Sequence, residues 1–163
     1  MAASSAVKPG INAAVYRNSG SYASPTWTEV TLIRDVTING PWNLADASIR
    51  ATKAVLQAKT QIALTGQIVI RADDADAGYQ ALWDASCLST SSGLLDLLIL
   101  DGDIATEGAM GFRAHWNINF SSQDQGAGNV VYTTFDIAPG WSSDGYPSKC
   151  EMGAASSPTF TAF

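Results

Sequence analysis

Residues 61–71 of the chain read QIALTGQIVIR and residues 112–121 read FRAHWNINFS, and both stretches alternate apolar and polar side chains. The apolar faces comprise Ile62, Leu64, Gly66, Ile68 and Ile70 in the first stretch and Phe112, Ala114, Trp116, Ile118 and Phe120 in the second. A period of two is typical of a strand that turns one face to the core and a polar face outward. These stretches therefore predict half-buried antiparallel strands.

The same alternation continues at residues 27–38 and 129–137, while residues 94–100 are apolar on both faces except at Asp96. An apolar run of this length indicates a central strand covered by a helix. Residues 74–87 supply that helix, because apolar side chains recur there at helical spacing behind an acidic start that suits an N-terminus. The members of this pattern are Asp73, Asp74, Asp76, Tyr79, Leu82, Trp83 and Ser86.

The order of these elements predicts a mainly β (α+β) fold, with two packed antiparallel sheets that form a sandwich or barrel flanked by one α-helix. We place this domain at residues 27–138, with a long loop at about residues 39–59. Residues 1–26 and 139–163 are rich in small residues and show no sustained period, so they are expected to be extended arms. The aromatic residues of the second arm should dock on the domain or on a neighbour.

The composition describes a surface that is short of charge. The 163 residues carry a formal net charge of -6, and 15% of them are charged, against about 25% in a typical soluble domain. Such a shortage is typical of an antiparallel β protein or of a subunit that buries much of its outside against copies of itself. Nine bases against fifteen acids also argue against tight binding of nucleic acid.

The N-terminus lacks the charged start and apolar core of a signal peptide, and no apolar run approaches the ~20 residues of a membrane span. We therefore expect synthesis in a bacterial-type cytoplasm, with Cys87 and Cys150 reduced and not paired.

Residues that might carry chemistry are few, and we expect no enzyme, no cofactor and no metal. Asp101, Asp103 and Glu107 do not complete the pattern of a calcium loop and favour a plain turn. The single histidine, His115, has no cysteine or carboxylate at ligand spacing beside it. Cys87 is expected to be buried and not nucleophilic. A small acid/base hydrolase that uses Asp101 or Asp103 is the weakest of the functions considered.

The charges are segregated along the chain. Between residues 47 and 72 every charge is basic, namely Arg50, Lys53, Lys59 and Arg71, and from residue 73 to residue 107 there are eight acids and no base. Opposite charges on one chain attract copies head to tail, although the acids also fit helix caps and turns. Of the five tryptophans, Trp83 and Trp116 fall on core faces, whereas Trp27, Trp42 and Trp141 suit subunit interfaces or a ligand platform.

The chain resembles the major tail tube proteins of long-tailed, non-contractile phages from about Trp27 to Ala138. The most specific element is Leu100-Asp101-Gly102-Asp103-Ile104-Ala105-Thr106, which follows an apolar strand. The helix start DDADAGY at residues 73–79, the basic loop at residues 45–59 and the strand at residues 130–138 complete the resemblance.

The resemblance implies a structural virion protein, made in the host cytoplasm, whose copies close into rings of six that stack into a tube for DNA ejection. It implies a tape measure protein in the lumen, terminator and distal tail proteins at the ends, and only transient passage of DNA. The expected subunit and ring contacts are Arg50, Lys53, Lys59, Asp101, Asp103, Glu107, Trp42 and Trp141. The expected lumen residues are Gln61, Thr65, Gln67, Asn117 and Asn119. The alternative is a secreted glycan-binding β-sandwich that uses exposed tryptophans.

Overall fold

The computed structural model describes residues 13–163 except residues 41, 47–56, 89–92, 126–129 and 146. These residues form one α-helix, α1 (Ala77–Cys87), and a short 3-10 helix (Ala154–Ser156). The strands are β1 (Ala14–Asn18), β2 (Trp27–Glu29), β3 (Ile33–Asn39), β4 (Trp42–Asp46), β5 (Gln57–Ile62), β6 (Thr65–Arg71), β7 (Leu94–Leu100), β8 (Met110–Asp124), β9 (Tyr132–Pro139), β10 (Ser148–Met152) and β11 (Pro158–Ala162).

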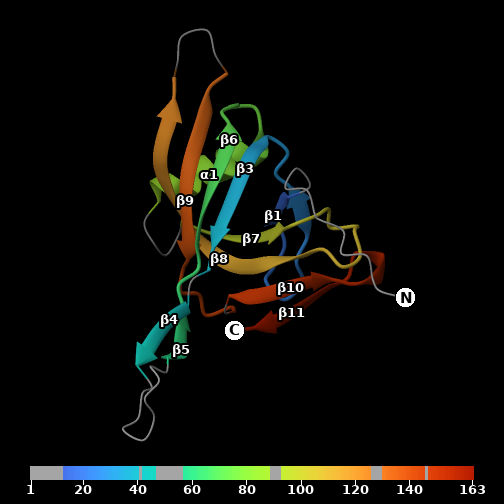
Figure 1. The fold of residues 1–163 in the computed structure, drawn as a ribbon. Helices are drawn as coiled ribbons and strands as arrows, with labels where there is room; N and C mark the ends of the chain where they lie inside the picture. Colours follow the sequence, from blue (N-terminus) through green and yellow to red (C-terminus); the bar gives the residue numbers. More distant parts are fainter. Residues whose placement is uncertain (1–12, 41, 47–56, 89–92, 126–129, 146) are drawn as a thin grey trace, which may run out of the picture.

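Nine of these strands make one antiparallel sheet in the order β2-β1-β7-β8-β9-β6-β3, with β10 and β11 attached through β8. The 15-residue strand β8 joins the two halves of the sheet. One of its edges pairs with β7 over residues 111–117, and the other pairs first with β10 and then with β9 over residues 116–124. In Figure 1 the strands β3, β6 and β9 run steeply across β7, β10 and the first part of β8.

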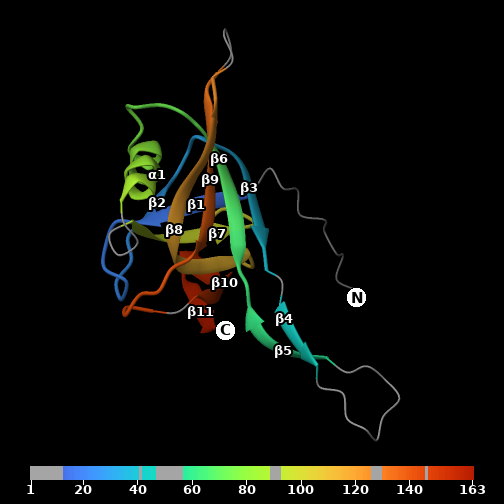
Figure 2. The ribbon, with the colours of Figure 1, turned by 90° about the vertical axis from the view of Figure 1, so that its left-hand side faces the viewer.

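The sheet therefore folds into two layers that share β8, and α1 lies against one side of them (Figure 2). The mainly β fold flanked by one helix is confirmed, and its two layers are parts of one continuous sheet. The hairpin of β4 and β5 stands apart as a separate two-stranded sheet that projects beyond both layers (Figures 1 and 2).

The main core lies between the two layers and the helix. Its members are the apolar faces that the alternating stretches predicted, among them Ile68, Ile70, Trp116, Ile118, Phe135 and Ile137, together with Tyr79, Leu82 and Ala85 of α1. A second cluster on the other face of β7 contains Tyr16, Leu98, Leu100, Ala109, Cys150 and Met152. Strand β7 is thus buried on both faces, as its apolar sequence predicted.

The helix begins at Ala77, three residues after the predicted start, because Asp76 is its N-cap. The Asp76 Oδ1 atom accepts a hydrogen bond of 2.7 Å from the Tyr79 backbone N–H. This bond satisfies one of the free N–H groups of the first turn. Trp83, predicted on the core face, is 37% exposed and packs edge-on against Phe120.

Two predicted strands are each split because their halves pair with different strands. Residues 27–38 form β2 and β3 with a turn at Thr31 and Leu32 between them; β2 pairs with β1, whereas β3 pairs with β6. Residues 61–71 contain the end of β5 and the whole of β6, separated at Ala63 and Leu64. An alternating pattern in the sequence does not reveal such a break, because periodicity does not report which strand each half pairs with.

The segments expected to be extended arms contain strands that belong to the sheet. Strand β1 lies inside the sheet between β2 and β7, with Val15 and Tyr16 buried. Strands β10 and β11 form a hairpin that buries Cys150 and Met152 against the second cluster. Five-residue strands carry too few apolar positions to show a period, and only their neighbours make them sheet. The remainder of the N-terminal stretch, residues 1–12, lies outside the described residues.

Candidate functional site

A polar sheet face is formed by the outward side chains of β3, β6, β9 and the second part of β8. A shallow hollow of about 390 Å³ on this face is lined mainly by Thr37, Asn39, Thr65, Gln67, Asn119 and Asp136. The strand register sets Gln67 between Thr37 and Asp136, and Asn119 opposite Asp136. The Gln67 Nε2 atom donates a 2.8 Å hydrogen bond to Asp136 Oδ1. The hollow therefore presents uncharged polar groups and one carboxylate.

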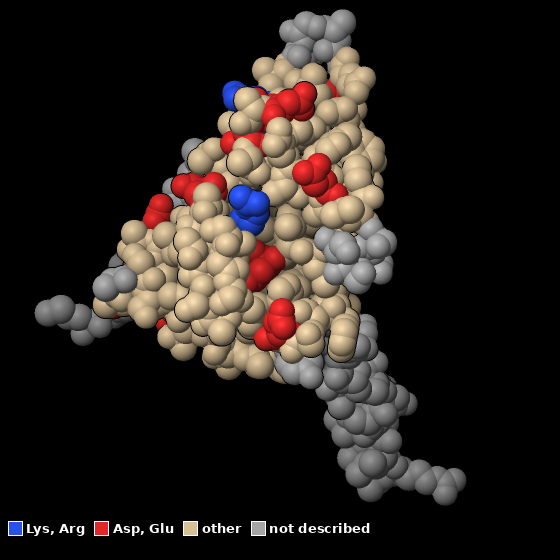
Figure 3. Space-filling model, turned by 180° about the vertical axis from the view of Figure 1, so that it is seen from behind, with Lys and Arg blue, Asp and Glu red and all other residues tan. Residues whose placement is uncertain are grey.

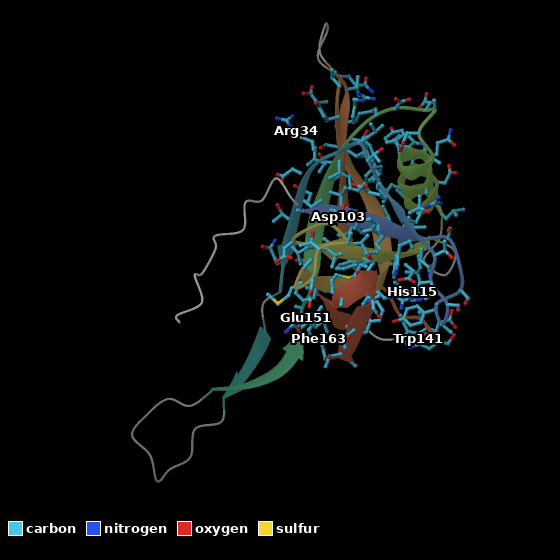
Figure 4. All side chains as sticks on the ribbon, turned by 90° about the vertical axis from the view of Figure 1, so that its right-hand side faces the viewer. Arg34, Asp103, His115, Trp141, Glu151 and Phe163 are labelled. Carbon is cyan, nitrogen blue, oxygen red and sulfur yellow. The ribbon has the colours of Figure 1, made fainter. Side chains whose placement is uncertain are left out.

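Two bases at the other end of this face each contact a neighbouring side chain. The Arg34 guanidinium lies over the Tyr132 ring, 4.7 Å from its centroid, and Arg71 pairs with Asp73 at 3.2 Å. Figure 4 shows Arg34 at the opposite end of the molecule from Trp141. A basic patch is therefore absent from the described part of the hollow itself.

The predicted lumen residues Thr65, Gln67 and Asn119 lie together on the polar sheet face. Asn117 precedes Asn119 on the same side of β8 and is half-buried, because Gly140 lies against it. Gln61 is in β5 of the projecting hairpin, and its side chain lies outside the described part of the structure. The alternating pattern was the signal that grouped four of these five residues.

The polar sheet face ends in two open strand edges. Within the described residues, β3 pairs with β6 alone, and residues 118–123 of β8 pair with β9 alone. Because the strands β3, β6, β9 and β8 alternate in direction, β3 and β8 run antiparallel to each other. An open edge presents backbone N–H and C=O groups that can pair with a strand of another chain. No sequence signal marked these edges, because pairing between distant strands decides which strand lies last.

The predicted basic contacts belong to the region of the projecting hairpin. Arg50 and Lys53 lie outside the described residues, whereas Lys59 is in β5 opposite Leu44, and Trp42 is the first residue of β4. The backbone of this hairpin extends away from the two layers (Figure 2).

The acidic contacts lie in the connection between β7 and β8. Asp101 Oδ1 accepts a 2.7 Å hydrogen bond from the Met110 N–H, and Asp103 Oδ1 accepts one of 2.6 Å from the Ala105 N–H. These carboxylates hold a turn, which is the structure that the sequence favoured. Glu107 is exposed and precedes Gly108, whose φ of 81° suits glycine. No group of three potential metal ligands occurs among the described residues.

Acidic side chains are spread over the helix side of the molecule, with few bases among them (Figure 3). None of the helices in the described ranges has the length and apolar character that a bilayer span requires.

The tryptophans occupy different surroundings. Trp116 is fully buried, and Trp141 is 84% exposed beside a hollow of about 420 Å³ that Leu64, Pro139 and Pro147 help to line. Trp27 is half-buried near Arg113. The side chain of Trp42 is outside the described part of the structure.

Sequence reasoning placed Arg113 on a polar outer face, but the structure buries it, with 3% exposed. Its guanidinium makes a two-point ion pair with Asp96, with Nε–Oδ1 at 3.0 Å and Nη2–Oδ2 at 2.7 Å. Its centre lies 3.7, 5.1 and 4.8 Å from the ring centroids of Tyr22, Trp27 and Phe160. Burial raises the pKa of the Tyr22 hydroxyl, and the nearby Arg113 charge opposes this shift. Asp96 is the one charged residue in the apolar run 94–100, and this was the sequence feature that could have indicated a buried ion pair.

Cys87 and Cys150 are not paired with each other, and Cys87 is exposed and not buried as predicted. Cys87 is the last residue of α1 and lies on its outer side. Cys150 is fully buried, and this burial raises the pKa of its thiol to about 11.

Comparison with known proteins gives matches in structure only. No family model matches the chain, and no curated protein matches it in sequence. A solved structure of the SPP1 tail tube superposes with a TM-score of 0.67 at 10% identity and covers 91% of this chain and 81% of that one. The tail of an empty gene transfer agent particle, solved with C6 symmetry, gives 0.62 at 9% identity over 96% and 100% of the two chains. The virion of the native gene transfer agent particle gives 0.60 at 9% identity with the same coverage. At these identities the matches establish a shared fold.

Proposed function

We propose that this protein is a structural virion protein of a phage-type particle, the subunit of a tail tube. In this proposal copies of the chain close into rings, which stack into a hollow tube that conducts DNA during ejection. The observation that carries it is a four-stranded sheet with a polar outward face and an open edge on either side, in a fold shared with the tail tube of SPP1.

The strand directions support closure into a ring. The strands β3, β6, β9 and β8 alternate in direction, so β8 of one copy beside β3 of the next continues the antiparallel order. Repeating this head-to-tail contact around a symmetry axis closes a barrel and covers the open edges of both β3 and β8. Six copies are the number we propose, since a tail with the same fold was solved with C6 symmetry.

The polar sheet face would then line the channel. Thr65, Gln67, Asn117 and Asn119 offer hydrogen-bonding groups that keep the wall hydrated, and Asp136 adds negative charge. The described lining of the hollow carries no base, so a phosphate backbone gains no counterion release there and DNA can move along it without being held. The proposed partners in the lumen and at the tube ends are a tape measure protein, a terminator and distal tail proteins.

Contacts between rings are proposed for the projecting hairpin and the acidic turn. The basic residues Arg50, Lys53 and Lys59 of one ring would meet Asp101, Asp103 and Glu107 of the next. Trp42 at the base of the hairpin and the exposed Trp141 would add apolar contact.

Negative-stain electron microscopy of the purified chain tests this function. We expect rings or hollow tubes whose abundance increases with protein concentration, because assembly follows mass action. A chain that stays monomeric at every concentration and binds polysaccharide would overturn the proposal and favour the glycan-binding alternative.

A further inference from the structure

A row of four aromatic rings leads from the core to the surface beside the open edge of β8. Tyr79, Trp83, Phe120 and Phe135 are joined by ring-centroid distances of 6.1 Å from Tyr79 to Trp83, 5.6 Å from Trp83 to Phe120 and 6.5 Å from Phe120 to Phe135. Tyr79 and Phe135 are buried, whereas 37% of Trp83 and 48% of Phe120 remain exposed. The core thus reaches solvent at Trp83 and Phe120, on the helix side of the sheet.

The opposite edge of the same sheet has a matching apolar border. Leu32, Ile33, Val36 and Ile38 pack against the main core but are only partly buried, because β3 is the last strand on that side. Their side chains lie on the core side of β3, while Thr37 and Asn39 lie on the polar sheet face.

At both edges the apolar side chains lie on the core side of the sheet and the polar side chains lie on the polar sheet face. Side chains on one face of a sheet remain on that face when another strand is added at its edge. A β3 strand added to the β8 edge therefore puts its core-side residues, Val36 and Ile38 among them, on the same face as Phe120, with the polar residues of both strands on the other side.

We propose that Trp83 and Phe120 of one copy pack against Val36 and Ile38 of the next copy and make the two cores continuous across the subunit boundary. The occupant of the exposed aromatic surface is thus a second copy of this chain. This inference rests on the proposed ring, and it assigns the residues that hold the ring together. In this contact the backbone hydrogen bonds between the β8 and β3 edges orient the two strands, and the apolar side chains supply the hydrophobic stabilisation.

Substitutions at Trp83 and Phe120 can show whether these side chains serve assembly or folding. We expect Trp83→Gln with Phe120→Thr to remain folded, as judged by circular dichroism and thermal unfolding, because both side chains lie at the solvent boundary of the core and not inside it. The concentration at which rings form should rise at least tenfold, measured by light scattering and electron microscopy. Met110→Gln is the matched control, because Met110 is 43% exposed at the other end of β8, and it should leave the threshold unchanged.

Interchain disulfides test the identity of the partner surface. Two variants are made in a Cys87→Ser background, one with Phe120→Cys and Val36→Cys and one with Phe120→Cys and Ile38→Cys. Oxidation of the assembled protein should give covalent multimers in at least one of them. The contact would be overturned if assembled tubes gave no such multimers, or if the double variant Trp83→Gln, Phe120→Thr assembled at the wild-type threshold. Neither result would contradict the proposed tube. A wild-type chain that never forms rings would instead overturn the proposed function, and the contact with it.

Discussion

Arg113 and Asp96 form a buried ion pair that is enclosed by rings from both ends of the chain. Tyr22 and Trp27 come from the N-terminal segment and Phe160 from β11, so the pair ties both chain ends to β7 and β8. The Tyr22 carbonyl accepts a further hydrogen bond of 2.8 Å from Arg113 Nη2, and Asn18 Nδ2 donates one to Asp96. Each buried charge is therefore compensated by several groups at once.

Replacing Arg113 by methionine should be strongly destabilising. The substitution leaves the Asp96 carboxylate buried without its counter-charge, which typically costs about 3–5 kcal/mol. We expect a loss of this size in the free energy of unfolding, measured by urea denaturation followed by circular dichroism. The control is Arg71→Ala, which removes an exposed ion pair and should cost about 0.5 kcal/mol. A loss for Arg113→Met as small as the control would contradict the role assigned to the pair.

The buried Cys150 thiol makes stability depend on pH in the alkaline range. Burial raises its pKa to about 11 from an ordinary value of 9.0. The folded protein holds this proton more tightly than the unfolded chain does, so the thiol's contribution is complete below about pH 9 and is lost as the pH rises toward 11.

We expect the free energy of unfolding to fall by about 1.5 kcal/mol more in the wild type than in Cys150→Ala between about pH 8.5 and 10.5. Urea titrations at several pH values measure both slopes. Burial also raises the pKa of the Tyr16 and Tyr22 hydroxyls, but these residues are present in both proteins and affect both slopes. Equal slopes would show that Cys150 is not the source.

At the scale of elements, the start of α1 depends on one side chain. Asp76 caps the helix, whereas Asp74, two residues earlier, is exposed. Asp76→Ala should lower the free energy of unfolding by about 1 kcal/mol because a free N–H group loses its acceptor. Asp74→Ala, with the same change of charge, should cost less than about 0.5 kcal/mol. Thermal unfolding of the two variants side by side checks this, and equal losses would indicate a general effect of charge instead of a cap.

The strands and the helix also show which elements the local sequence pattern could predict. The alternating residues of β6, β8 and β9 and the helical spacing of α1 predicted both the elements and their buried faces, because one face of each must be covered wherever it lies. The break between β2 and β3 was not predictable, since it arises where the chain passes from one layer to the other. Strands β1, β10 and β11 were missed because they are short and become sheet only through partners far along the chain.

At the scale of the whole molecule, the segregated charges predict an effect on assembly and none on folding. Arg50→Glu with Lys53→Glu should block tube formation, because the basic residues proposed to meet the acidic turn of another copy would then repel it. The variant should keep the wild-type circular dichroism spectrum and unfolding midpoint. Lys149→Glu, an exposed base on β10, is the control for net charge and should still give tubes. Electron microscopy and sedimentation measure the yield, and an unchanged yield of tubes would refute electrostatic docking.

The sequence by itself determined the fold class, the faces of the longer strands, the helix and its acidic cap, and the polar residues that share one sheet face. These features follow from local periodicity and turn chemistry, which act over a few residues. Tertiary structure alone decided which strands lie at the edges, that β8 serves both layers, that Arg113 is buried, and that an aromatic row reaches the surface at Trp83 and Phe120. Each of these depends on pairing between segments that are distant in the chain, and a strand's own residues do not specify what lies beside it.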